Sequence, residues 1–253
     1  MVGIDMNIVI HPQYQHFCSF LESLPQTFGK EGESIYKGRN EIKVFHTLEG
    51  DVAVKSFKVP ALFNRLIYTF FRSSKAKRSY EHSLLLKTKG IEVPTPVAYI
   101  EEKKYFLLAS SYYVSAYLGY PGMLRELAYH PLEEVEDLVV AFARFTAFLH
   151  ENEVLHIDYS PGNILYKKAG AEYHFAILDT NRMKFGAVDW KTGCNNLRRL
   201  WGSQETIARI AREYARARGF DEQRTEVLTL EKHTQFWKRY SGKHKGEKPY
   251  KKE

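Results

Sequence analysis

Three residues in the second half of the chain have side chains suited to binding a metal or accepting a proton. Asp158 and Asn163 lie five residues apart in LHENEVLHIDYSPGNILY, and Asp179 follows the apolar segment HFAIL. A loop carrying Asp158 and Asn163 can direct a carboxylate and an amide toward one point, and a strand that ends near Asp179 can bring a second acid there. Two acids and an amide suit magnesium, a hard cation that takes oxygen ligands and often shares them with phosphate.

A lysine suited to binding phosphate lies further upstream. Lys55 ends the strand-like segment VAVK, and the first acidic residue after it is Glu81. A lysine that meets phosphate in a cleft needs an opposite charge to hold it, so we expect Glu81 to pair with Lys55. Each residue alone has an ordinary interpretation, a solvated strand lysine or a helix-surface charge, and the Asp and Asn residues could cap turns. Their joint occurrence favours function.

The first half of the chain predicts β-strands interrupted by two helices. Strand-like segments separated by turn signals predict an antiparallel meander over residues 34–37, 41–45 and 51–57. Apolar residues at helical spacing predict an amphipathic helix over 61–71, and a second helix runs from about 74 to 89 and ends at Gly90. Further strands are expected at 97–100, 105–108 and 112–114.

The second half of the chain predicts helices. Acidic residues after Pro131 are followed by apolar residues at i, i+3, i+4 and i+7, which is typical of a helix with its first turn at this proline. Further helices are expected at about 204–218 and 230–240. We therefore expect an N-lobe over 1–118, a C-lobe over 119–241 and a basic disordered tail over 242–253.

These residues together resemble the protein-kinase-like fold. Lys55, Glu81, the motif His156-x-Asp158-x4-Asn163 and Asp179 occur in the order found in that superfamily. Within it, the segments IYKGRN, VPTP, YSPGNIL and LDTNRMKFG resemble the bacterial lipopolysaccharide core kinases, which phosphorylate Kdo or heptose sugars. The resemblance covers about residues 28–201. It implies an α+β, bilobal protein-kinase-like fold with a β-rich N-lobe and a mainly helical, shortened C-lobe.

The resemblance also implies an activity, namely ATP- and magnesium-dependent transfer of the γ-phosphoryl group to a sugar hydroxyl of the lipopolysaccharide core or a lipid A precursor. Asp158 would orient or deprotonate that hydroxyl. Asn163 and Asp179 would hold magnesium. His156 would hold the loop by hydrogen bonds and is not expected to be catalytic. The residues implied in nucleotide binding are Lys55 and Glu81 at the phosphates, Gly38 and Arg39 in the covering loop, and the backbone of Ser115, Ala116 and Tyr117 at adenine.

The sequence departs from the kinase pattern in ways that leave alternatives open. The phosphate-covering loop has only Gly38, so Arg39 or Asn40 would share the phosphate contacts. Asp179-Thr180-Asn181 replaces the motif DFG, and no APE-like segment follows, which argues against a protein substrate. The alternatives are a phosphotransferase for aminoglycosides or choline-like alcohols, and a catalytically silent binding module. An acidic lining near Asp158 would favour cationic acceptors, and a basic lining would favour an anionic glycolipid.

Charge and composition bear on location and partners. The net charge is +7, and two cysteines are too few for a disulfide framework, which suits a reducing cytosol. Residues 59–79 contain no acid, and residues 232–253 carry eight Lys or Arg against two Glu. Both segments fit peripheral contact with an anionic membrane, here the cytoplasmic face of the inner membrane. Their ordinary alternatives are core packing and a solvated tail. No nucleic-acid motif, signal peptide or transmembrane helix is expected.

Overall fold

The computed structural model describes residues 5–58 and 73–243. By its internal contacts the chain divides into two compact units, which we describe separately. The first comprises Met1–Gly119 together with Asp179–Asn181, and the second comprises Tyr120–Leu178 together with Arg182–Glu253. The helix predicted at 61–71 and all but the first two residues of the basic tail lie outside the described residues.

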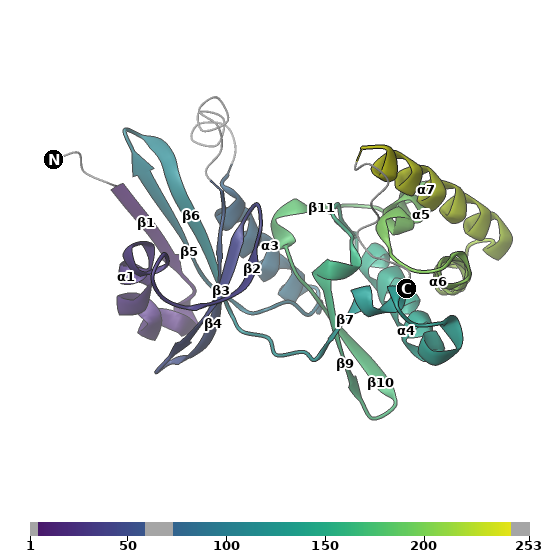
Figure 1. The fold of residues 1–253 in the computed structure, drawn as a ribbon, viewed down its shortest axis with the longest axis horizontal. Coiled ribbons are helices and arrows are strands. Elements are labelled where there is room, and N and C mark those ends of the chain that lie inside the picture. Colours follow the sequence, from purple (N-terminus) through teal and green to yellow (C-terminus); the bar gives the residue numbers. More distant parts are fainter. Residues whose placement is uncertain (1–4, 59–72, 244–253) are drawn as a thin grey trace. The chain divides into compact units, whose positions relative to one another are not determined.

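The first unit is built on one six-stranded antiparallel sheet (Figure 1). Its strand order is β1-β5-β6-β4-β3-β2. The strands are β1 (Asp5–Ile10), β2 (Glu33–Lys37), β3 (Glu41–Thr47), β4 (Gly50–Ser56), β5 (Pro96–Lys104) and β6 (Leu107–Ala116). The predicted meander is confirmed as β2, β3 and β4. The strand β1, the short 3-10 helix η1 (Pro12–Phe17) and the helix α1 (Cys18–Thr27) were not predicted.

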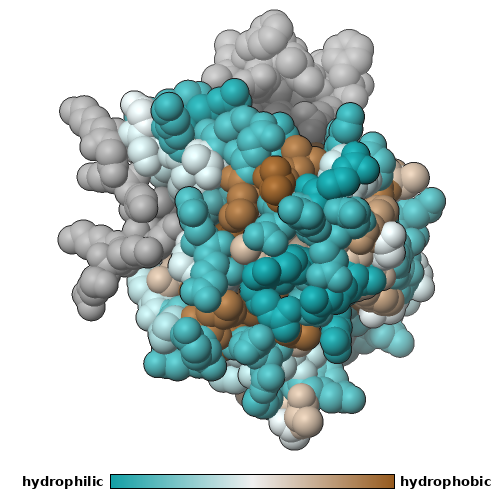
Figure 2. Space-filling model, turned by 90° about the vertical axis from the view of Figure 1, so that its right-hand side faces the viewer, coloured by the Kyte–Doolittle hydropathy of each residue, from teal (hydrophilic) through white to brown (hydrophobic). Residues whose placement is uncertain are grey.

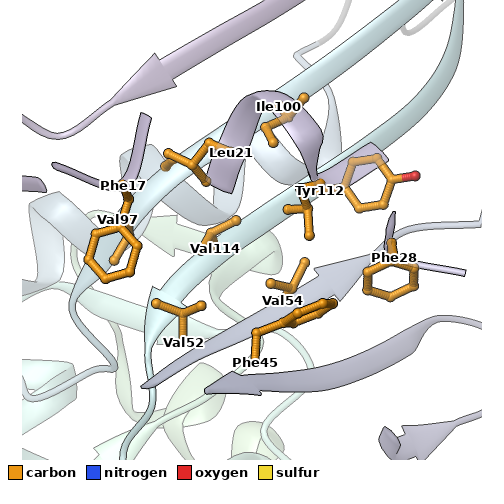
Figure 3. Close-up of a cluster of buried hydrophobic side chains, with 12 residues drawn as sticks. Phe17, Leu21, Phe28, Phe45, Val52, Val54, Val97, Ile100, Tyr112 and Val114 are labelled. Atoms are coloured by element: carbon orange, nitrogen blue, oxygen red, sulfur yellow. The ribbon is translucent and has the colours of Figure 1, made fainter. Parts of the chain in front are cut away.

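The two faces of this sheet bury different side chains, because successive strand residues point to opposite sides. Val54 of β4 and Val114 of β6 pack with Leu21 of α1 in one buried cluster (Figure 3). On the other face, Tyr99 and the partly buried Tyr113 pack with Tyr80 and Ala76 of α3 (Lys75–Thr88). Lys55 follows Val54 and pairs in register with Tyr113, so its side chain lies on the α3 face.

The helix predicted from about residue 74 is confirmed as α3. It begins at Lys75 after Ser74, whose hydroxyl accepts the backbone N–H of Lys77 as an N-cap does. The strand prediction for 105–108 and 112–114 is partly wrong. β6 is one continuous strand, and Tyr105 and Phe106 form a two-residue turn in which both have positive φ. The alternating pattern did not mark this turn, because neither residue is a usual turn former.

The second unit is mainly helical, with two small antiparallel sheets. Its helices are α4 (Leu132–Glu151), α5 (Trp190–Asn196), α6 (Gln204–Arg218) and α7 (Glu222–Lys243), with short 3-10 helices η2 (Leu124–Ala128), η3 (Pro161–Asn163), η4 (Thr180–Arg182, which it shares with the first unit) and η5 (Leu197–Arg199). One sheet has the order β10-β9-β7, and the other pairs β11 with β8. These strands are β7 (Gly122–Met123), β8 (Val154–His156), β9 (Ile164–Ala169), β10 (Glu172–Ile177) and β11 (Met183–Phe185).

The predicted helices of this unit are confirmed, with one change of length. α4 begins directly after Pro131, and α6 has the predicted bounds between Ser203 and the left-handed Gly219. α7 begins at Glu222 rather than near 230, because the Asp221 carboxylate accepts the backbone N–H of Arg224. Figure 2 shows the side on which α6 and α7 lie in Figure 1, and this surface is mainly hydrophilic with small separate hydrophobic patches. Among the described residues, no helix combines the length and apolar character needed to span a bilayer.

Candidate active site

Lys55 forms an ion pair with Asp179 in the first unit. Its Nζ lies 2.7 Å from Asp179 Oδ1, and both side chains are largely shielded from solvent. The predicted contact between Lys55 and Glu81 is not the one observed. Glu81 is half exposed and lies 3.8 Å from Nζ of Lys77, one helical turn earlier on α3. Asp179 therefore takes the position at Lys55 that the sequence motif predicts for Glu81.

A series of hydrogen-bonded hydroxyl groups holds the segment after Asp179 on α3. Tyr113 donates to Ser83 Oγ at 3.0 Å, and Ser83 Oγ lies 2.9 Å from Thr180 Oγ1. Thr180 Oγ1 in turn donates to the backbone carbonyl of Ser79 at 3.0 Å. Because each hydroxyl has one proton, it can donate only one hydrogen bond. Donation therefore runs from Tyr113 to Ser83, from Ser83 to Thr180, and from Thr180 to the Ser79 carbonyl.

The backbone around Asp179 is fixed as well. The Thr180 carbonyl accepts a hydrogen bond of 2.7 Å from Nδ1 of His82. Asp179 has φ of 54°, in the left-handed region that Asp tolerates better than most residues, and its carboxylate accepts a bond from the Asn181 amide. The carboxylate at Lys55 is therefore positioned by its neighbours in this short segment.

Positive charge accumulates around this ion pair. Lys55 Nζ lies 5.3 Å, and Lys75 Nζ 6.0 Å, from the centre of the Phe57 ring. Burial lowers the pKa of Lys75, the nearby charges of Arg39, Arg78 and Lys55 lower it further, and Asp179 opposes the shift. Such repulsion indicates more cations than this one carboxylate neutralises.

The predicted phosphate-covering loop is the turn between β2 and β3. Gly38 donates its backbone N–H to the Asn40 carbonyl, and Asn40 Oδ1 accepts the backbone N–H of Lys58 just after β4. The turn thus lies at the end of the strand that carries Lys55. Through Arg39 it contributes charge near Lys75.

The segment predicted to meet adenine lies at the end of β6. Ser115 is buried within the sheet, and Tyr117 is exposed. The backbone N–H groups of Ala116 and Tyr117 already donate to the carbonyls of Thr95 and Asp51. These two donors are satisfied within the fold, so a base bound here would use the carbonyl groups of the segment.

Asp158 is bound by two arginines in the second unit. Arg182 Nη1 lies 2.7 Å from Oδ2, and Arg199 Nη1 lies 2.5 Å from Oδ1. Pairing of β8 with β11 aligns His156 with Met183, which brings Arg182 beside Asp158. Neither arginine is predicted from the sequence motifs. Arg182 lies within the family-like segment LDTNRMKFG, but only the strand pairing shows that it faces Asp158.

The loop that carries Asp158 is held from several sides. His156 is buried, its Nε2 donates to the Leu178 carbonyl at 3.0 Å, and its own carbonyl accepts the Asn196 amide at 2.9 Å. The predicted structural role of His156 is therefore confirmed. Tyr159 is fully buried and bonds Thr146 of α4 through its hydroxyl at 2.9 Å.

Asn163 is also fixed by this loop. Its Nδ2 donates to the Asp158 carbonyl at 2.9 Å, which leaves Oδ1 as the side-chain atom able to bind a metal. Its own carbonyl accepts the backbone N–H of Leu178, the residue directly before Asp179. The backbone bond ties the loop to the chain that leads into the Asp179 segment.

The donor chemistry of the predicted metal ligands fits magnesium. Among the described residues, no group of three or more His, Cys, Asp or Glu side chains could hold a metal by itself. Asp179 and Asn163 would supply one carboxylate and one amide oxygen. Magnesium commonly takes few protein oxygens and completes its octahedral shell with phosphates and water. The oxygen donors of these two residues are therefore of the kind that magnesium takes.

Comparison with known proteins identifies the fold. No protein-family model and no curated protein sequence matches this chain. A solved structure, that of WaaP in complex with acyl carrier protein, aligns with a TM-score of 0.61 over 91% of this chain and 99% of that chain, at 17% sequence identity. The fold is protein-kinase-like. The predicted combination of a β-rich lobe and a helical lobe is confirmed.

Proposed function

We propose that this protein is a kinase that transfers the γ-phosphoryl group of ATP to a hydroxyl of an anionic sugar in the lipopolysaccharide core or a lipid A precursor. The observation that carries this proposal is the pair of arginines on Asp158. A basic surrounding at this residue favours an anionic acceptor over a cationic one. The structural likeness to WaaP, a lipopolysaccharide core kinase, supports the same class of reaction.

The charge balance around Asp158 is positive. Arg182 and Arg199 outnumber the one carboxylate, and Arg198 is adjacent. Burial lowers the pKa of Arg198 and the charge of Arg199 lowers it further, whereas Asp158 raises it. A carboxylate or phosphate on the acceptor would offset this repulsion, because the planar guanidinium binds both groups in a two-pronged geometry. An aminoglycoside would bring further positive charge to the same place.

Each set of residues has a distinct task in the proposed reaction. Asp158 orients the acceptor hydroxyl and accepts its proton, for which the hydroxyl must displace one guanidinium from the carboxylate. Lys55, with Lys75 and Arg39 near it, binds the nucleotide phosphates. Asp179 and Asn163 would hold magnesium, which would neutralise charge on the transferred group. The reaction therefore depends mainly on positioning and charge.

The proposed acceptor also suggests where the enzyme works. A glycolipid acceptor lies in a membrane, so we propose that the protein contacts the cytoplasmic face of the inner membrane peripherally. The basic segments 59–72 and 244–253, outside the described residues, support this through their composition alone. Lys75 and Arg78, from the same basic stretch, instead contribute charge to the Lys55–Asp179 site.

The test is an ADP-release assay with magnesium, ATP and three kinds of acceptor. These are a Kdo- or heptose-phosphate-bearing lipopolysaccharide precursor, a neutral sugar and an aminoglycoside. We expect turnover with the anionic acceptor, and we expect the double variant Arg182→Gln, Arg199→Gln to lower kcat/KM for it much more than for the neutral sugar. Lys184→Gln, an exposed position on the neighbouring strand β11, is the matched control for loss of charge.

Other outcomes select the alternatives. Preference for the aminoglycoside, or equal effects of the double variant on all acceptors, would contradict the anionic acceptor. Nucleotide binding without turnover on any acceptor, unchanged by Asp158→Ala, would instead identify a silent binding module.

A further inference from the structure

Two exposed aromatic side chains lie at the tip of the hairpin formed by β5 and β6. The two strands of this hairpin are labelled in Figure 1. Tyr105 is 66% exposed and Phe106 is 85% exposed. Lys104 and Leu107 are the last paired residues, so these two aromatics form the whole turn. Single exposed apolar residues are common on protein surfaces, whereas two adjacent aromatics at a convex tip require an explanation.

The backbone of the tip is unfavourable for these residue types. Tyr105 and Phe106 have φ of 51° and 62°, so both adopt the left-handed conformation required by a two-residue hairpin turn. Asn-Gly is the preferred sequence for such a turn, and bulky side chains at positive φ raise the free energy of the folded state. Neither side chain recovers this cost by burial. Strain of this kind, maintained without a packing benefit, points to a function.

The residues around the tip indicate the kind of partner. Lys103 and Lys104 precede the turn, and Lys104 Nζ lies 5.9 Å from the centre of the Tyr105 ring. Two acidic residues lie nearby. Asp5 of β1 pairs in register with Lys103, and the Glu102 carboxylate accepts a hydrogen bond from the hydroxyl of Ser110. The turn itself therefore combines aromatic rings with lysine charge.

A lipid bilayer interface fits this combination better than a protein partner. Two side chains at a convex tip cannot bury the roughly 1,000 Å² expected of a specific protein interface. Aromatic rings are favoured at the headgroup level of membranes, and lysines beside them attract anionic lipids. We propose that the β5–β6 tip inserts Tyr105 and Phe106 into the interface of an anionic bilayer, with Lys103 and Lys104 at the headgroups.

The tip is separate from the nucleotide site, so the proposal does not rest on the proposed kinase activity. β6 runs for ten residues, from Leu107 next to the tip to Ala116. At about 3.3 Å per residue the tip lies roughly 30 Å from the strand end predicted to meet adenine. Substitutions at the tip therefore leave the residues assigned to ATP unchanged.

The test uses the full chain and vesicles of phosphatidylglycerol and phosphatidylcholine. The double variant Tyr105→Asn, Phe106→Gly is expected to weaken co-sedimentation by about tenfold or more, because two buried rings are lost. The same variant is expected to raise Tm, because Asn-Gly fits the turn. The matched control is Leu48→Ser, which removes a fully exposed apolar side chain from the β3–β4 turn. It is expected to leave binding unchanged.

A site-specific signal separates the tip from other membrane-binding segments. Phe106→Trp is expected to shift tryptophan emission to the blue with these vesicles, beyond any shift of the unmodified protein. Lys103→Gln with Lys104→Gln is expected to reduce the preference for phosphatidylglycerol over phosphatidylcholine alone. Unchanged co-sedimentation of the Asn-Gly variant, or no added blue shift in the Phe106→Trp variant, would overturn the proposal.

Discussion

Two short segments of the candidate site share one construction. In each, an acidic residue is followed by a buried residue whose hydroxyl group bonds a hydroxyl on a helix. Asp158 is followed by Tyr159, which bonds Thr146 of α4. Asp179 is followed by Thr180, which bonds Ser83 of α3. The buried residue fixes the backbone, and the acid before it remains available for chemistry.

Tyr159 and Thr180 are the anchors of these two segments, and they differ in the interactions that hold them in place. The Tyr159 ring is fully buried and stacks on Phe142 with 5.9 Å between ring centres. Packing of the ring therefore contributes most to fixing this residue. Thr180 is small, and its contacts described above are hydrogen bonds to α3. The comparison indicates that the Asp158 loop is part of the core of its unit. The Asp179 segment is joined to its unit by a polar network, which can be weakened without removing core volume.

The acids themselves are expected to differ most in a kinetic experiment. Asp158→Asn should lower kcat on the sugar acceptor by about 10²–10⁴ with nucleotide affinity retained, because the proton acceptor is lost. Asp179→Asn should weaken binding of ATP with magnesium, since a ligand of the metal is lost. ADP release and nucleotide titrations with and without EDTA measure the two effects. Identical profiles for the two variants would mean that the acids do not have separate roles.

The packed anchor should give the largest effect on stability. Tyr159→Ala is expected to lower the free energy of unfolding by about 3–5 kcal/mol, as for other large core truncations. Tyr159→Phe should cost only about 1 kcal/mol, because Thr146 keeps its hydrogen bond to the Phe142 carbonyl. Urea unfolding measures both. Similar losses for the two variants would show that the hydroxyl, and not the ring, holds the loop.

Low pH should also destabilise the unit that contains the Asp158 loop. His150 Nε2 donates to Asn196, whose amide bonds the His156 carbonyl, and His150 Nδ1 accepts from Tyr214. Burial lowers the pKa of His150 to about 4, the bond to Asn196 opposes the shift, and the charge of Arg218 adds to it. Below the ordinary pKa of 6.5 the unfolded chain binds a proton that the folded chain does not. Stability should therefore fall between pH 6.5 and about 4, by about 3 kcal/mol.

The variant His150→Gln isolates this contribution. It should remove the part of the pH dependence between 6.5 and 4 while lowering stability at neutral pH. Chemical denaturation across this range provides the measurement. An unchanged slope in the variant would assign the acid sensitivity to other groups.

The polar anchor should show a smaller loss of stability and a clear loss of function. Thr180→Val removes the hydroxyl and leaves Ser83 and the Ser79 carbonyl without this partner, which should cost about 1–3 kcal/mol. The apparent affinity for magnesium should fall, because Asp179 is less well positioned. Thr180→Ser retains the hydroxyl and is the control for both measurements. A loss of stability with unaltered magnesium dependence would limit Thr180 to a structural role.

The smallest expected effect concerns the charge around the Lys55–Asp179 pair. Lys75→Met should raise KM for ATP about tenfold or less, since the lysine is partly exposed and its charge is screened. Lys77→Met is the matched control, because it removes a lysine from the same helix turn that pairs with Glu81. Equal changes in KM for the two variants would indicate a general charge effect and not a phosphate contact.

Much of the architecture followed from patterns between neighbouring residues. Alternating side chains predicted the β2–β3–β4 meander, and the spacing of apolar residues predicted α3, α4 and α6. These features depend on local backbone preferences, caps and the burial of one face, which a short segment displays by itself. The order of Lys55, Asp158, Asn163 and Asp179 along the chain also indicated a kinase-like fold.

The partners of the site residues were decided by the tertiary structure. The sequence motif predicts Glu81 as the partner of Lys55, but the network that places Thr180 on α3 brings Asp179 to Lys55 instead. The two arginines on Asp158 come from distant parts of the chain, and only the β8–β11 pairing places Arg182 there. The turn at Tyr105 and Phe106 is likewise set by the register of β5 with β6, although both residue types disfavour the positive φ that this turn requires. Contacts between residues far apart in sequence depend on how whole elements pair and pack, and no local pattern specifies that pairing.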